Sequence, residues 1–457
     1  MNRRLTLACS VAGAVLVALD GTVLTVAQPS LQGSLHASYA EVQWTSTAYL
    51  LVVAGLLVFA GRLGDRYGQR RMFALGMLGF GAASAAIGFA PGIGWVIGLR
   101  VVQGVFGALL QPATLGMLRA AYPPDRLAMP LAVRTSAIGL AAATGPLVGG
   151  ALATWLGWRS VFFLGVLPAL AFGLAALGGK APRVSTPRVS TPGLDLPGAL
   201  LLAASLAPLV HALSAPGAAT VPALAVSAVA GVAFVRHERR AAHPLLPPGV
   251  IGAGPVGAAL GILVAVSAAL FGTLFVETYV LQRGLGLDPF ESAVRSAPLA
   301  VMMIASAPCC PALLRRWGAR WTTSVATAVL ALGGLVLSRA TGALPLGVGF
   351  ALLGAGFGTV MVAATHVVVR QAESTAAGVA GGLQQTALNI GPVVGVAAAT
   401  ALMDAGPRAA LCVFAALAAA AVPVARALPQ RGSAHGALDA DAREAEVRVL
   451  PGDPARP

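Results

Sequence analysis

Charged residues are scarce in this chain, and their scarcity excludes an ordinary soluble protein. Only 10% of the 457 residues are charged, whereas 57% are hydrophobic and the mean hydropathy is +0.82. A soluble protein of this length needs far more charge to cover its surface. The alternating segments of about ten residues that build outer-membrane barrels are also missing. Apolar runs of about 20 residues recur instead, which predicts an all-α polytopic membrane protein embedded in the lipid bilayer.

Residues suited to catalysis are few and scattered. The spacing of the four cysteines is not typical of a metal site or a disulfide, so we expect them to be small core residues. They are Cys9, Cys309, Cys310 and Cys412. The six histidines do not cluster, although a membrane enzyme needs its reactive groups or metal ligands gathered at one face. No Gly-Lys-Ser/Thr phosphate loop supports direct coupling to ATP. We therefore predict neither an enzyme nor a bound metal or cofactor.

Fourteen apolar stretches are candidate membrane spans. They lie near 5–28, 44–61, 72–90, 94–118, 129–154, 160–178, 196–214, 219–235, 255–281, 292–314, 321–338, 342–369, 376–402 and 407–426. Beyond them the chain is rich in Ala, Pro, Arg and Asp, a composition typical of disorder. We predict an N-terminal six-helix bundle (1–178), cytoplasmic linkers with two additional helices (179–250), a C-terminal six-helix bundle (251–426) and a disordered cytoplasmic tail (427–457).

The net charge of +14 is explained by membrane topology. If both termini are cytoplasmic, the inner segments hold 24 basic residues and the outer loops hold five, while Arg100 lies within a span. This asymmetry predicts that both termini lie in the cytoplasm. Arginine makes up 29 of the 30 basic residues, and with abundant Ala, Gly and Pro this bias is typical of a GC-rich bacterium, so we expect the bacterial inner membrane. The asymmetry also accounts for the basic charge without a nucleic-acid partner.

An internal repeat divides the chain into two halves. Residues 66–70 (RYGQR) are echoed by 316–320 (RWGAR), and 145–149 (GPLVG) are echoed by 391–395 (GPVVG). The offsets, 250 and 246 residues, are nearly equal, which indicates two six-helix halves with two extra helices (about 196–214 and 219–235) between them.

Four motifs in order resemble those of the major facilitator superfamily, and in particular its 14-span drug:proton antiporter branch. Residues 19–29 are similar to the first-helix signature, with Gln28 in place of the usual leucine. Residues 61–71, 100–104 and 145–150 are similar to the motif between helices 2 and 3, the helix 4 arginine motif and the helix 5 antiporter motif. The resemblance covers about residues 5–426 and implies the major facilitator fold.

The segment 61–71 concentrates four arginines, one aspartate and three glycines between two spans. Its glycines permit a tight turn, and its aspartate can accept bonds from helix amides and nearby arginines. The resemblance implies a conformational latch between the halves, formed by Gly61, Asp65, Arg66, Gly68, Arg70 and Arg71. The positive-inside rule alone would explain the arginines, but neither the aspartate nor the glycine spacing.

Asp20 is an acid inside a predicted span, where a charge costs at least about 2.5–3.5 kcal/mol. Helix rise places it roughly 22 Å above the inner face, and Arg100 on helix 4 roughly 21 Å above that face. The two charges therefore reach similar depth. We expect a proton-coupling carboxylate beside a basic partner, with a purely structural ion pair as the alternative.

Three further polar residues are candidates for contact with protons or substrate. Glu277 lies near the outer end of helix 9, where snorkelling to the interface is an equal alternative. Gln384 and Asn389 lie on helix 13, where hydrogen bonds between helices are an equal alternative. The helix 5 motif contributes Gly145, Pro146, Gly149 and Gly150, which should kink the helix and allow a neighbour to approach closely.

The resemblance implies a secondary transporter that exports small amphipathic or cationic organic compounds, such as drugs and antibiotics, in exchange for protons. Its halves would rock about a central cavity, with the proton gradient as the energy source. A dedicated exporter of one metabolite, such as a self-made antibiotic, would share every motif. An importer would lack the helix 5 motif. We expect no nucleic-acid partner and no obligatory protein partner.

Overall fold

The computed structural model describes residues 2–123, 126–178, 195–214, 217, 219–241, 254–371 and 377–429, and these are almost entirely helical, without a strand. The predicted tail lies outside the described residues from 430 onward, as do linker residues 179–194 and 242–253. The helices are α1 (Arg3–Leu35), α2 (Tyr39–Tyr67), α3 (Gln69–Gly88), α4 (Ile93–Ala121), α5 (Ala128–Leu156), α6 (Trp158–Phe163), α7 (Val166–Gly178), α8 (Leu196–Ser214), α9 (Thr220–Glu238), α11 (Gly254–Tyr279), α12 (Pro289–Leu337), α13 (Ala343–Gln371), α14 (Ala377–Leu402) and α15 (Pro407–Ala421), with short helices η2 (Val280–Gly284), η3 (Met403–Ala405) and η4 (Pro423–Ala427).

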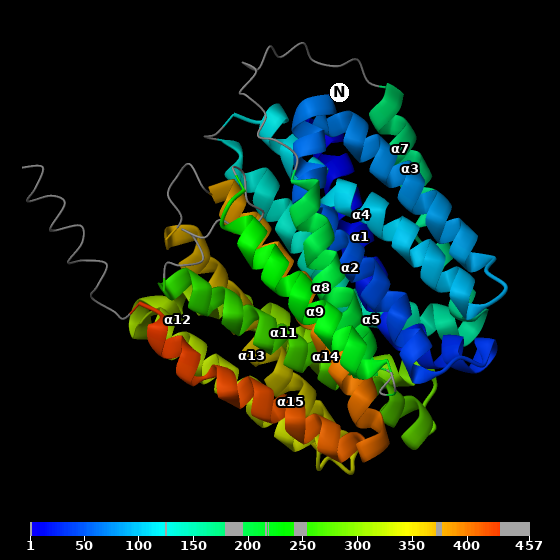
Figure 1. Cartoon of the computed structure of the whole chain (residues 1–457), viewed down its shortest axis with the longest axis vertical. Helices are drawn as coiled ribbons and strands as arrows, with labels where there is room; N and C mark the ends of the chain where they lie inside the picture. Colours follow the sequence, from blue (N-terminus) through cyan, green and yellow to red (C-terminus); the bar gives the residue numbers. More distant parts are fainter. Residues whose placement is uncertain are drawn as a thin grey trace, which may run out of the picture.

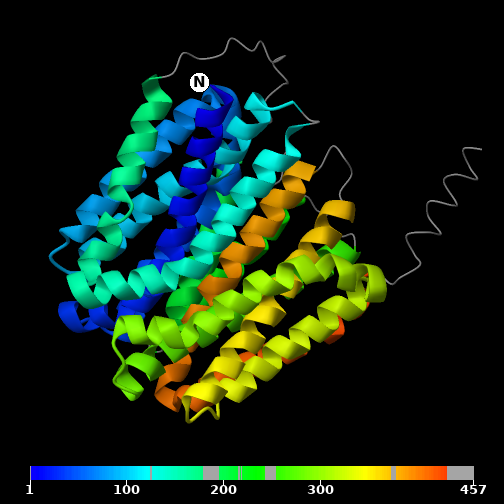
Figure 2. The same cartoon turned by 180° about the vertical axis from the view of Figure 1, so that it is seen from behind.

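Two groups of helices pack around separate hydrophobic cores. The cores of the first group draw on α1 to α7, and residues such as Phe73 and Phe80 are fully buried there. The core of the second group draws on α11 to α15, with Phe350 and Phe414 at its centre. Figures 1 and 2 show the first group in blue to blue-green and the second in yellow-green to red, on opposite sides of the molecule.

The helices α8 and α9 pair with each other beside the junction of the two groups (Figure 1). α8 contacts α2 of the first group and α14 of the second. Val210 of α8 packs with Val393 and Ala397 of α14, and Trp44 and Leu50 of α2 border the same cluster. Through α8 the pair therefore contacts both groups.

The sequence repeat has matching structure in both halves. Gly68 links α2 to α3 with φ 96°, and Gly318 interrupts α12 with φ 75°, a left-handed region that favours glycine. The capping box of α2 begins at Ser38, and that of α12 begins at Asp288, again 250 residues apart. Equivalent helices in the two halves thus begin and break at equivalent positions.

Eleven described helices are long and apolar enough to cross a membrane, or twelve if the bent halves of α2 form one span. α12 is 49 residues long, and the non-helical dihedral angles of Gly318 divide it into arms 289–317 and 319–337. In α8 the apolar stretch Leu200–Ala212 is shorter than a span. The count of fourteen spans, like the region boundaries, therefore stays a prediction.

Candidate functional site

A buried ion pair joins α1 to α4. Arg100 Nη1 lies 2.6 Å from Asp20 Oδ2, and the arginine side chain is only 1% exposed. Asp20 is 10% exposed, so the carboxylate lies at the edge of the cluster and the guanidinium inside it. A buried charge is tolerated when it is paired and hydrogen-bonded, and both conditions hold here.

Arg100 is held from three sides besides the carboxylate. Its Nε donates to the backbone carbonyl of Thr45 at 2.7 Å, and its Nη1 donates to Gln103 Oε1 at 2.6 Å. The guanidinium also lies over the ring of Tyr49, 4.4 Å from the centroid, in a cation–π contact. These contacts with α2 and α4 hold the arginine in addition to its bond to Asp20.

Gln103 connects the ion pair to a third helix. Its Nε2 donates to Asp20 Oδ1 at 3.1 Å and to Ser84 Oγ on α3 at 2.8 Å. The carboxylate therefore accepts from both Arg100 and Gln103, one donor to each oxygen. Sequence reasoning assigned no role to Gln103, Ser84 or Tyr49, although Gln103 lies three residues after Arg100 and hence on the same helix face.

Glu277 is a buried acid on α11, in the other half. It is 1% exposed, and neither carboxylate oxygen has a hydrogen-bond partner among the described residues. This burial excludes snorkelling to the interface, the equal alternative from the sequence. A carboxyl group without partners differs chemically from Asp20, whose two oxygens are both bound.

Two polar residues of α14, Gln384 and Asn389, differ in their hydrogen bonds. Gln384 Nε2 donates to Thr365 Oγ1 on α13 at 2.5 Å, which is the interhelical bond expected as one alternative. Asn389 is 6% exposed, and its Nδ2 has no partner among the described residues. The Nδ2 of Asn389 is therefore a buried donor that a ligand could bind.

The motif between α2 and α3 forms a tight junction centred on Gly68. Asp65 is exposed and accepts a hydrogen bond from Gln69 Nε2 at 2.7 Å. Among the described residues no arginine is seen in an ion pair with Asp65, so the arginine partners stay a prediction. Gln69 is the nearer donor because its side chain is confined between Gly64 of α2 and Gly116 of α4.

The remaining motif residues face several neighbours. Gly61 lies near Pro112 of α4, where an added Cβ would make ordinary contact at 3.6 Å. Arg66 lies over the ring of Tyr67, 5.5 Å from its centroid. Arg70 Nη2 donates to the backbone carbonyl of Leu177 at the end of α7, and Arg71 is exposed.

The helix 5 motif is the surface on which α5 packs against α1. A Cβ added to Gly145 would overlap the side chain of Thr22, and one added to Gly149 would lie 2.6 Å from the carbonyl oxygen of Val23. Both contacts fall two or three residues after Asp20. Gly391 and Gly395 of α14 approach α11 equally closely, as the repeat predicts.

The two halves are joined at the side of the molecule opposite the first helix turn of α1. Gly150 abuts the backbone of Pro289, and Pro146 lies within α5 nearby. Thr154 Oγ1 of α5 accepts from the backbone N–H of Phe290 at 3.1 Å and lies 3.4 Å from Asp288 Oδ1. We call this side, where the two halves are in contact, the closed side.

A second group of contacts joins the two halves on the same side. Gln282 Nε2 donates to the backbone carbonyl of Val26 at 2.8 Å. The rings of Tyr39 and Tyr279 meet edge to face with centroids 4.9 Å apart, and the guanidinium of Arg283 lies within 6 Å of both rings. Gln282 and Arg283 belong to η2, a π-helical turn of a kind found frequently at functional sites.

Comparison with known proteins agrees with this architecture. The helical spans, the two halves and the buried charge cluster define a multi-pass membrane protein of the transporter type. The chain belongs to the Major Facilitator Superfamily, whose family model matches residues 11–396. It is 37% identical to the tetracenomycin C resistance and export protein of Streptomyces glaucescens, over 93% of this chain and 84% of that relative.

Other relatives also match most of the chain. The chain is 33% identical to the puromycin resistance protein pur8 of Streptomyces alboniger, over 84% of this chain and 79% of the relative. It is 30% identical to the multidrug efflux pump LfrA of Mycolicibacterium smegmatis, over 84% of this chain and 77% of that pump. The matched family therefore extends over most of the chain rather than one segment.

Solved structures share the fold at low sequence identity. A bacterial homologue of the human lysosomal transporter Spinster matches with a TM-score of 0.66 at 18% identity, over 93% of this chain and 97% of that chain. The POT family transporter PepTSo matches with a TM-score of 0.65 at 14% identity, over 92% of this chain and 97% of that chain. These similarities establish the fold alone.

Proposed function

We propose that this protein exports small amphipathic or cationic organic compounds across the bacterial inner membrane in exchange for protons. The relatives named for tetracenomycin C export, puromycin resistance and multidrug efflux support export of such compounds. The excess of basic residues on one side of the spans supports an orientation with both termini in the cytoplasm.

The observation that carries the proposal is the Asp20–Arg100 pair with its Gln103 bridge. A proton on Asp20 removes the negative charge that attracts Arg100, while Thr45 and Gln103 still hold the guanidinium. Asp20 can then change partners without exposing an unpaired arginine. Proton binding and cation binding become alternatives at the same carboxylate, which is the requirement for exchange.

The packing of α5 on α1 offers a route from this proton to the rest of the molecule. Gly145 and Gly149 contact α1 immediately after Asp20, and Gly150 contacts the other half at Pro289. A small rotation of α1 on losing its bond to Arg100 would press on α5 at a contact with no free space. In the proposed cycle, a cationic substrate that binds Asp20 from the cytoplasm causes this movement and opens the closed side. A proton from outside then takes the place of the substrate on Asp20 and releases it.

Glu277 and Asn389 give the C-terminal half its own contacts for a ligand. Both are buried, and each has polar atoms without a partner among the described residues. A carboxyl group can bind either a proton or a cation, and an amide donor can bind a carbonyl or hydroxyl group. Gln384 is proposed to position α14 against α13 through Thr365.

The segment around Gly68 is proposed as the latch on the cytoplasmic side. It contains Asp65, Arg66, Arg70 and Arg71, and the bond from Arg70 to Leu177 ties the start of α3 to the end of α7. The two halves are in contact on the opposite side. We therefore propose that this conformation is open to the cytoplasm at the latch.

A second candidate function is dedicated export of one metabolite made by the host. Relatives named for tetracenomycin C, actinorhodin and methylenomycin A favour it, because each name carries a single compound. Everted vesicles containing the protein distinguish the two. With an acidic interior, we expect uptake of a lipophilic cation and of chemically unrelated antibiotics, abolished by a protonophore. Uptake of one compound alone would support dedicated export, and uptake that ignores the proton gradient would contradict antiport.

A further inference from the structure

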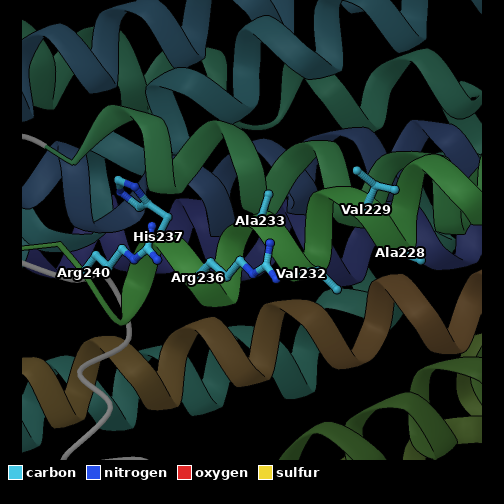
Figure 3. Close-up of a pocket in the computed structure, with 7 residues that line it drawn as sticks. All are labelled: Ala228, Val229, Val232, Ala233, Arg236, His237 and Arg240. Carbon is cyan, nitrogen blue, oxygen red and sulfur yellow. The ribbon is translucent and has the colours of Figure 1, made fainter.

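A shallow groove runs along one face of α9 and continues beyond its end (Figure 3). The lining residues are spaced so that they form a single stripe of the helix. They are Ala228, Val229, Val232, Ala233, Arg236, His237 and Arg240. The stripe is apolar over its first half and basic over its second, so the groove has the polarity of an amphipathic molecule lying along the helix.

The apolar half is exposed to a degree unusual for valine. Val229 is 71% exposed and Val232 is 55% exposed, although α9 has the composition of a membrane span. In a membrane protein such side chains face lipid tails. The opposite face of α9 packs on α8 through Phe234, which is buried against Leu202. The groove therefore lies on the lipid-facing side of the α8–α9 pair.

The basic half carries two cations that have no carboxylate partner among the described residues. Arg236 and Arg240 are exposed, and neither forms an ion pair with a carboxylate of the described residues. Nearby acids are oriented elsewhere: Asp195 lies 2.6 Å from His237 Nε2, and Glu238 is buried beside Gly198. The contact between Asp195 and His237 fixes this end of α9 to the start of α8 and leaves both arginines available.

We propose that this groove binds an anionic phospholipid of the leaflet that borders the arginine-rich side of the protein. Arg236 lies in the last turn of α9 and Arg240 lies in the turn that follows, and both line the same groove, so both guanidinium groups can reach one phosphate. Arginine is suited to this role because its planar group binds phosphate oxygens in a bidentate manner. An acyl chain of the same lipid would lie on Val232 and Val229.

The proposal predicts selective binding of phosphatidylglycerol over phosphatidylcholine. Native mass spectrometry of the purified full-length protein, titrated with each lipid, measures the two affinities. The variant Arg236→Gln/Arg240→Gln should lose about 25-fold in phosphatidylglycerol affinity, since each arginine near an anionic surface contributes about fivefold. Phosphatidylcholine binding should stay unchanged.

Arg239→Gln is the matched control, because Arg239 is exposed at the same helix end but does not line the groove. This variant should keep the wild-type affinity for phosphatidylglycerol. The thermal stability of all the variants should equal that of the wild type. Inorganic phosphate should compete poorly, because it lacks the acyl chain, and Val232→Asn should weaken long-chain more than short-chain lipid. Equal losses in Arg239→Gln and the double variant would overturn the proposal, as would competition by phosphate at the affinity of the lipid.

Discussion

The Asp20 carboxylate and the Arg100 guanidinium lie 2.6 Å apart and join α1 to α4 inside the N-terminal half. Since Arg100 is almost completely buried, the pair cannot be replaced by solvent when one partner is removed. The pair is therefore both a stabilising contact and the proposed centre of proton exchange. Variants of the two residues should affect stability and transport differently.

Arg100→Ala should reduce the yield of folded protein, because it leaves the Asp20 charge buried without its partner. Removing one member of such a pair costs about 3–5 kcal/mol. Asp20→Ala/Arg100→Ala removes both charges and should recover most of the thermal stability, measured by fluorescence-detected gel filtration, without recovering transport. If the double variant is as unstable as Arg100→Ala, the pair is not what makes the single change costly.

Gly149→Val should prevent α5 from packing on α1. The added Cβ would lie 2.6 Å from Val23 O and 2.8 Å from Val23 Cα, and backbone atoms cannot move aside as a side chain can. Gly139→Val on the same helix is the control, because nothing lies within 4 Å of its Cβ. Thermal stability and vesicle transport should fall in the first variant and remain near wild type in the second. Similar losses in both would indicate helix propensity rather than close packing.

The closed side should have to open in every transport cycle. In a variant lacking the four native cysteines, Thr154→Cys and Asp288→Cys should react together with a short reducible bifunctional thiol reagent, because the native side chains are 3.4 Å apart. Cross-linked protein should lose transport and regain it after reduction. Each single-cysteine variant, treated identically, should remain active. Full transport by the cross-linked protein would show that these contacts need not separate.

Glu277→Gln should leave the protein folded, because the native carboxyl group has no described partner to lose. If Glu277 contacts charged ligands, the variant should transport neutral substrates normally and cationic substrates at least several-fold more slowly. Glu41→Gln changes an acid in the capping box of α2 and controls for a general effect of losing one carboxylate. Equal effects on neutral and cationic substrates would remove Glu277 from the ligand site.

The sequence predicts the Asp20–Arg100 approach because helix rise fixes the depth of each residue in a membrane. It does not predict how each helix is rotated about its axis, which depends on packing between helices. For that reason Tyr49 and Ser84 carried no recognisable signal. Gln103 could have been found, since it follows Arg100 by three residues within the same motif.

Two other expectations show the same limit. Hydropathy could not decide whether Glu277 faces lipid or protein, and the structure buries it. At Asp65 the abundance of arginines drew attention away from Gln69, whose confined amide donates to this carboxylate. Close packing at Gly145 and Gly149 was predictable, because small residues inside spans permit helices to approach.

The most direct test of proton exchange is transport by Asp20→Asn, which keeps the size and polarity of the side chain but cannot ionise. The assay follows uptake of a lipophilic cation and of a neutral substrate into everted vesicles with an acidic interior, at matched expression. The account predicts that Asp20→Asn fails to accumulate either substrate against its gradient, with the weakest binding for the cation, and that Asp20→Glu retains part of the activity. Accumulation of the cation by Asp20→Asn, driven by the pH difference alone, would contradict Asp20 as the essential proton carrier.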